Sequence, residues 1–78
     1  MKVVEITKEP IELYKLLKLE GMAASGAEAK HVISEGRVFV NAKVETRKRK
    51  KMLSGDTLEF GEYKIRLQLV KDYLNNPL

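Results

Sequence analysis

Residues 25–40, SGAEAKHVISEGRVFV, carry the strongest fold signals in the sequence. Ser25 and Glu28 have the spacing of a capping box, in which the serine hydroxyl accepts from the Glu28 N–H and the glutamate carboxylate accepts from the Ser25 N–H. Gly36 is the left-handed residue expected just after such a helix. Between them, apolar residues recur at the spacing of one helix face: Ala29, Val32 and Ile33. After Gly36 the apolar period changes to two, so this stretch predicts a short helix followed by a strand.

Weaker patterns lie N-terminal to this stretch. Val4 and Ile6 alternate with polar residues, which predicts a short edge strand. Pro10 suits the first turn of a helix, and Gly21 is its expected end. The apolar stripe of that helix is Ile11, Leu13, Leu16 and Leu17.

Turn residues and short alternating segments follow the second helix. Val38 and Val40 begin the alternation, and it is clearest around Ile65. Asn41-Ala42-Lys43 predicts a tight turn, but Ala42 at positive φ costs about 1–2 kcal/mol, so a longer loop remains open. The order predicts an α+β domain with a short N-terminal strand, two short helices and a small antiparallel, turn-rich sheet. The core should hold Leu16, Leu17, Ala29, Val32, Ile33, Val38, Val40, Leu58 and Ile65.

Length and composition bound the possible functions. A chain of 78 residues fits one domain with a thin core, and residues 72–78 are expected to form a flexible tail. Cysteine is absent, which excludes disulfides and thiolate chemistry. The N-terminus has no long apolar run, so a soluble cytoplasmic protein without a membrane span is the simplest interpretation. His31 is the only histidine, and we expect no catalytic residue, metal site, cofactor or small-molecule substrate.

The positive charge is concentrated in one segment, TRKRKK at residues 46–51. The net charge is +4, and it becomes −1 without Arg47, Lys48, Arg49, Lys50 and Lys51. Neighbouring cations repel one another, so a run of this kind favours binding to a polyanion. If the run were a strand, about three of the five side chains would reach one ligand together, because strand side chains alternate between faces.

The segment 25–60 resembles the RNA-binding domain family named for protein four of the small ribosomal subunit, the S4-like family with its alpha-L RNA-binding motif. The likeness covers about residues 10–67 and is greatest for the small free-standing bacterial branch. Two positions depart from the family pattern, with Gly26 in place of arginine and Ala42 in place of glycine. The residues that carry the resemblance are Ser25, Ala29, Ile33, Gly36-Arg37-Val38, Val40-Asn41, Lys43-Val44 and Gly55-Asp56.

The resemblance implies a non-catalytic protein that binds structured RNA, ribosomal or transfer RNA, with a role in ribosome assembly or quality control. By matching position, the RNA-facing residues would be Ser25, Lys30, Arg37, Asn41 and Lys43. The basic run would lie beside them and supply electrostatic affinity. The five aromatic residues form no evident cluster in the sequence, which favours recognition of RNA by shape and backbone over base stacking.

Other function classes remain open at this level. A polybasic segment also binds anionic membrane surfaces, although no amphipathic helix with exposed Trp or Phe accompanies this one. Non-specific DNA binding would use the same cations. An enzyme fragment or regulatory subunit acting on RNA is disfavoured because the sequence shows no carboxylate pair and no Cys–His arrangement.

Overall fold

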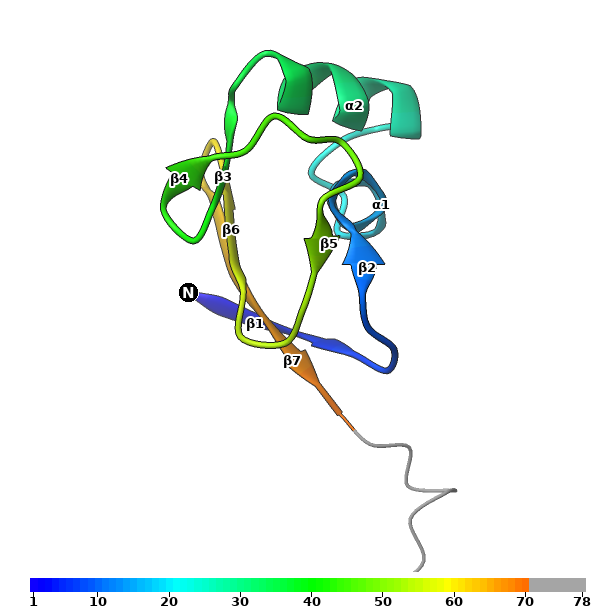
Figure 1. The fold of residues 1–78 in the computed structure, drawn as a ribbon, viewed down its shortest axis with the longest axis vertical. Coiled ribbons are helices and arrows are strands. Elements are labelled where there is room, and N and C mark those ends of the chain that lie inside the picture. The colour runs from blue at the N-terminus through cyan, green and yellow to red at the C-terminus, as the bar shows by residue number, and fades with distance from the viewer. Residues whose placement is uncertain (71–78) are drawn as a thin grey trace, which may run out of the picture.

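The structure, a computed structural model, describes residues 1–70; the expected tail at 72–78 lies outside the described residues. Over the described residues the chain forms two helices and seven short strands, in agreement with the predicted α+β class (Figure 1). In chain order they are β1 (Lys2–Ile6), β2 (Ile11–Glu12), α1 (Leu13–Leu19), α2 (Gly26–Ser34), β3 (Val38–Val40), β4 (Lys43–Val44), β5 (Lys51–Met52), β6 (Thr57–Phe60) and β7 (Tyr63–Leu69).

The main sheet has five strands in the order β1-β7-β6-β3-β4. β1 is an edge strand, as predicted, but it pairs in parallel with β7, so that Val4 lies opposite Leu67. The predicted antiparallel sheet is confirmed for the strands that follow the helices, and the N-terminal strand extends that sheet in parallel. Alternation of apolar residues is the same in parallel and antiparallel strands, so the sequence pattern did not reveal the direction of β1. The other strand pairs of this sheet are antiparallel.

A second sheet joins β2 to β5, and this pairing changes the start of the first helix. Ile11 lies opposite Met52 and Glu12 opposite Lys51. The helix begins only at Leu13, so the placement of Pro10 in a first helical turn is wrong. Ile11 and Glu12 form a strand because partners 41 and 39 residues away in the chain are available, and a local pattern does not contain that information.

The second helix follows the sequence pattern closely. The Ser25 hydroxyl accepts a hydrogen bond from the Glu28 N–H at 3.1 Å. The carboxylate of Glu28 accepts from the Ala24 N–H at 3.0 Å, one residue earlier than the predicted Ser25 N–H. Gly36 has a φ of 77°, as expected for the residue that ends this helix. The cap therefore fixes the direction in which α2 leaves the preceding loop.

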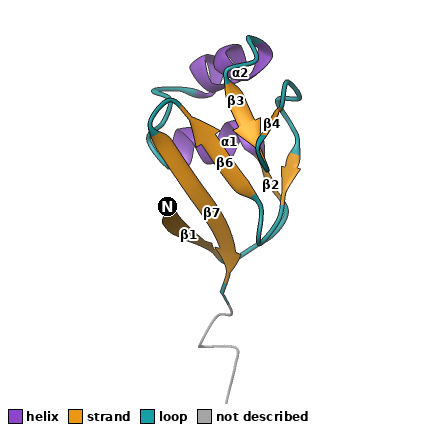
Figure 2. Cartoon of the chain, turned by 90° about the vertical axis from the view of Figure 1, so that its left-hand side faces the viewer, coloured by secondary structure: helices purple, strands orange, loops and turns teal. Residues whose placement is uncertain are grey.

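Both helices pack on one face of the five-stranded sheet, whereas within residues 1–70 no helix covers its other face (Figure 2). Every predicted core residue is buried. The core also includes residues from β1, α1, β5, β7 and the helix-connecting loop, among them Val4, Leu13, Met22, Met52 and Leu67. Within the same range, no helix is long and apolar enough to cross a lipid bilayer.

A two-residue turn joins β3 to β4. Asn41 and Ala42 have φ values of 51° and 68°, so the alanine takes the left-handed conformation and the chain forms no longer loop. The side chain of Asn41 compensates for part of the cost. Its amide donates to Asp56 at 3.1 Å and accepts from the Thr57 N–H at 2.9 Å, which fastens the turn to the start of β6.

Candidate nucleic-acid interface

The basic run lies mainly in the loop between β4 and β5, and two backbone hydrogen bonds fix this loop to α1. The Leu13 N–H donates to the Lys50 carbonyl at 2.9 Å, and the Tyr14 N–H donates to the Lys48 carbonyl at 3.1 Å. The first N–H groups of a helix have no partner within the helix, and here the loop supplies acceptors for two of them. The cations are therefore carried by a backbone that is held at defined points.

Most of the run forms a turn. The Lys50 N–H donates to the Arg47 carbonyl at 3.2 Å, and only Lys51 belongs to a strand. The strand-like alternation considered for this run is therefore wrong. The turn gathers four of the five cations around one open hollow of about 400 Å³, lined by Arg47, Arg49, Lys50 and Lys51. We call this the basic hollow.

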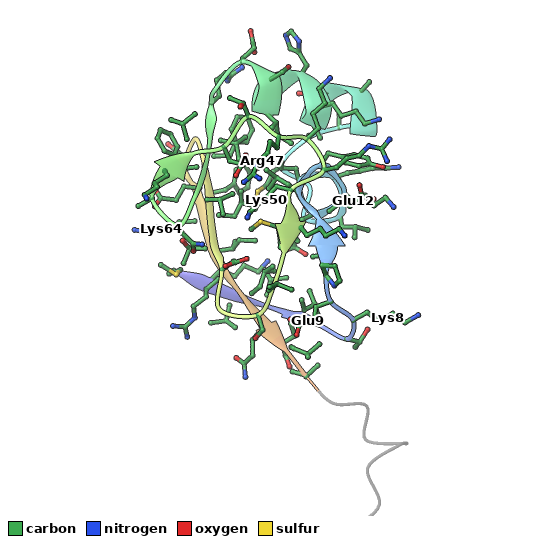
Figure 3. All side chains as sticks on the ribbon, in the orientation of Figure 1. Lys8, Glu9, Glu12, Arg47, Lys50 and Lys64 are labelled. Atoms are coloured by element: carbon green, nitrogen blue, oxygen red, sulfur yellow. The ribbon has the colours of Figure 1, made fainter. Side chains whose placement is uncertain are left out.

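A second hollow, the hairpin hollow, adjoins the first. Its volume is about 590 Å³, and it shares Arg47 and Lys50 with the basic hollow. These two side chains lie close together at the centre of Figure 3, between β4 and β5. The other lining residues are Val40, Asn41, Lys43, Val44 and Glu45. Six of the ten predicted RNA-contacting residues thus line one continuous, mostly basic region.

One arginine of the run is held by a carboxylate of the same loop. Arg47 donates to both oxygens of Glu45, with Nε at 2.9 Å and Nη2 at 3.0 Å, and its backbone N–H donates at 3.0 Å. The side-chain hydrogen bond from Arg47 lowers the pKa of Glu45 from 4.5 to about 2. The pair also raises the pKa of Arg47. Part of the charge of this arginine is therefore neutralised inside the protein.

The remaining cations differ in how they are paired. The Nη1 atom of Arg49 lies 3.6 Å from one carboxylate oxygen of Glu12. The other oxygen of Glu12 lies 3.1 Å from Nζ of Lys15. Among residues 1–70, no carboxylate is within ion-pairing distance of Lys48, Lys50 or Lys51. These three lysines carry the charge in the loop that is free to meet an anion.

Tyr14 connects the loop to α2. The Nζ atom of Lys30 lies 4.6 Å from the centre of its ring, and the guanidinium of Arg49 lies 5.7 Å from the same centre. Cations at these distances are attracted to an aromatic ring. Lys30, a predicted contact residue on α2, is therefore brought next to the basic loop through Tyr14.

Other predicted contact residues have structural roles or lie elsewhere. Ser25 caps α2 and lines neither hollow. The amide of Asn41 is occupied by Asp56 and Thr57. Arg37 lies 5.3 Å from the ring centre of Phe60 and 3.5 Å from Glu35, and it lines neither hollow. The structure thus gathers Lys43 with most of the basic run, and it leaves Arg37 outside that region.

Two residues have clear roles in this region that were not predicted from the sequence. Glu45 stands two positions before Arg47, a spacing that puts two side chains on the same side of an extended chain, and this signal was available. Tyr14 gave no such signal, because its cation neighbours Lys30 and Arg49 come from distant parts of the chain.

Comparisons with known proteins agree with one another. The "Putative RNA-binding protein YbcJ" of Escherichia coli K12 is 46% identical over 68 residues, which cover 86% of this chain and 97% of that protein. The "Probable ribosome maturation protein RlbA" of Bacillus subtilis 168 is 35% identical over 65 residues, covering 80% and 92%. The solution structure of E. coli YbcJ, described as revealing an ALFAL motif involved in RNA binding, superposes with a TM-score of 0.66 at 45% identity and covers 87% of each chain.

The family itself is identified over most of the chain. Residues 4–68 match the S4 domain. This range contains both helices, the whole of β2 to β6, most of β1 and β7, and both hollows. The resemblance first found in the segment 25–60 is confirmed by this match. The chain therefore belongs to the S4 domain family.

Proposed function

We propose that this protein binds structured RNA without catalysing a reaction, through the face formed by the basic and hairpin hollows. The observation that carries the proposal is the convergence of Lys43, Arg47, Arg49, Lys50 and Lys51 on two adjoining hollows. Folded RNA presents closely spaced phosphates, and binding several of them releases condensed counterions. The names of the relatives, an RNA-binding protein and a ribosome maturation protein, support RNA as the polyanion.

The geometry suggests how such binding works. The loop backbone is already fixed to α1 by two hydrogen bonds, so little conformational entropy is lost there when RNA binds. Within residues 1–70, Lys48, Lys50 and Lys51 have no ion-pair partner, and they supply mobile charges that adjust to phosphate positions. Lys43 and Lys30 extend the charged region toward the hairpin and α2. Ribosomal RNA in an assembling particle is the partner that the relatives favour, with transfer RNA as the other structured candidate in the cytoplasm.

A charge-reversal pair with a matched control tests this proposal. The test variant carries Lys50→Glu and Lys51→Glu, and the control carries Lys8→Glu and Lys64→Glu. Both have the same net charge, but Lys8 and Lys64 line neither hollow and lie away from Arg47 and Lys50 (Figure 3). We expect the test variant to lose at least about tenfold in affinity for folded ribosomal RNA, since each lost phosphate contact weakens binding. The control should lose much less.

The same experiment separates the alternative classes. Transfer RNA, double-stranded DNA of similar length and vesicles containing anionic lipid are titrated under the same salt conditions. Equal losses by the two variants would mean that net charge alone drives binding, and the proposed interface would be wrong. If the protein bound the vesicles tightly and bound neither ribosomal nor transfer RNA, its partner would be an anionic membrane surface and not RNA.

A further inference from the structure

A third hollow lies beside the basic loop, between α1 and the start of α2. Its volume is about 320 Å³, and it is lined by Tyr14, Lys15, Lys18, Leu19 and Gly26. Leu19 is 70% exposed, so its apolar side chain is accessible to a ligand in this hollow. We call it the tyrosine hollow.

The tyrosine hollow combines apolar walls with a positive surrounding. The ring of Tyr14 and the side chain of Leu19 supply apolar surface, while Gly26 has no side chain to fill the space. Lys15 and Lys18 line the same hollow, and Lys30 lies over the ring of Tyr14. In the part of the chain that the structure describes, neither Lys18 nor Lys30 has an ion-pair partner.

Tyr14 connects this hollow with the proposed RNA-binding face. Its N–H is bonded to the carbonyl of Lys48, and its ring attracts Arg49 from the basic hollow. A polyanion bound along the basic loop would therefore pass next to the tyrosine hollow. A ligand in that hollow should present a flat apolar group to the ring and a negative charge to the lysines.

An unpaired nucleotide of RNA has this combination. Its base stacks on aromatic rings, and its phosphate is attracted to the surrounding lysines. Bases within an RNA helix are already stacked and paired, so only a bulged or looped-out nucleotide has its base available. From this match we propose that the tyrosine hollow binds one unpaired nucleotide of the RNA, with its base against Tyr14 and Leu19 and its phosphate near Lys18 and Lys30. This inference rests on the proposed function.

The probes are two RNA hairpins of the same stem sequence. One has a single unpaired 2-aminopurine nucleotide in the stem, and the other is fully paired with 2-aminopurine inside the helix. Wild-type protein should bind the bulged hairpin more tightly and change the fluorescence of its unpaired base. Tyr14→Leu should lose about tenfold in affinity for the bulged hairpin, the range expected for one stacked base. It should lose less than about twofold for the paired hairpin, where no base is free to stack.

Two variants control for indirect effects. Tyr14→Phe keeps the ring and should retain the preference for the bulged hairpin that Tyr14→Leu loses. Tyr63→Leu makes the same chemical change at a tyrosine that is 48% exposed at the start of β7, and it should leave binding unchanged. Because Tyr14 also packs against the core, thermal unfolding of each variant is measured alongside.

A second variant tests the tyrosine hollow if Tyr14→Leu does not fold. At Gly26, a Cβ atom would lie 3.8 Å from the Tyr14 ring, an ordinary contact, so Gly26→Leu should fill the hollow and leave the ring in place. It should reproduce the selective loss for the bulged hairpin. Equal losses for both hairpins, no loss in either, or no fluorescence change with wild type would overturn the inference. If wild type binds neither these hairpins nor folded ribosomal RNA, the proposed function itself fails.

Discussion

Arginine and lysine have different parts in the basic run. Arg47 and Arg49 each reach a carboxylate of the protein, at 2.9 Å from Glu45 and 3.6 Å from Glu12. The planar guanidinium of arginine fits a carboxylate with two parallel hydrogen bonds, whereas lysine carries a compact charge on a flexible stem. The arginines therefore help to shape the loop, and the lysines are left with the charge that an incoming phosphate can use.

The Glu45–Arg47 pair should make the stability of the protein depend on pH in the acid range. The folded pKa of Glu45 is lowered from 4.5 to about 2, so its contribution to stability is complete above pH 4.5 and disappears as the pH falls toward 2. We expect Glu45→Gln to lower the free energy of unfolding at pH 7 by roughly 0.5–1 kcal/mol, the range for an exposed ion pair. The wild-type and variant curves from urea unfolding should converge near pH 2.

Glu5→Gln is the matched control for this change. Glu5 is an exposed carboxylate on β1, and within residues 1–70 no ion pair involves it. Its variant should follow the wild-type curve. A constant difference between wild type and Glu45→Gln from pH 7 to pH 2 would show that the ion pair does not cause the effect.

The turn between β3 and β4 is where the sequence departs from an ideal hairpin. Ala42 adopts a φ of 68°, which costs an L-residue about 1–2 kcal/mol. Glycine adopts this conformation without strain but loses more entropy on folding. Ala42→Gly should therefore raise the free energy of unfolding by roughly 0.5–1 kcal/mol, measured by urea denaturation.

The same substitution at a helical position should have the opposite sign. Ala27 is an exposed residue of α2, and Ala27→Gly should lower the free energy of unfolding by about 1 kcal/mol, because glycine is a poor helix former. If Ala42→Gly destabilised the protein as much as Ala27→Gly does, the left-handed conformation of Ala42 would be contradicted.

Local elements could be predicted from the sequence, and pairings between distant segments could not. The cap at Ser25, the stop at Gly36 and the alternation after it are local signals, and each is confirmed. The β2–β5 sheet and the direction of β1 depend on partners far away in the chain. The same division holds for the site, since the basic run was evident while its contacts with Glu12 and Tyr14 were not.

The molecule as a whole has one surface of mixed charge and another that is mainly positive. The outer face of the main sheet mixes charges, with Glu59 paired to Lys64 at 3.8 Å and with Glu5 and Arg66 exposed on neighbouring strands. Positive residues predominate in the basic hollow, and this asymmetry concentrates the electric field on one side. The roles of individual residues in RNA binding stay predictions, and the asymmetry tells us where to test them.

The salt dependence of RNA affinity measures how many phosphates this face meets. Five lysines near the loop have no ion pair within residues 1–70: Lys30, Lys43, Lys48, Lys50 and Lys51. If each of them binds one phosphate, a plot of log K against log salt concentration should have a slope of about −3.5 to −4.5. Lys50→Gln should reduce the magnitude of the slope by about 0.7–0.9. Lys8→Gln should not change it, and equal changes in both variants would indicate diffuse attraction.

The most direct test is to map the surface of the protein that RNA contacts. Amide and side-chain NMR signals of isotope-labelled protein are followed while folded ribosomal RNA is added at moderate salt. We expect the largest changes at residues 43–51, Lys30 and Tyr14, with little change at Glu5, Lys64 and Arg66. Changes centred on the outer face of the sheet, with residues 47–51 unaffected, would contradict the proposed interface.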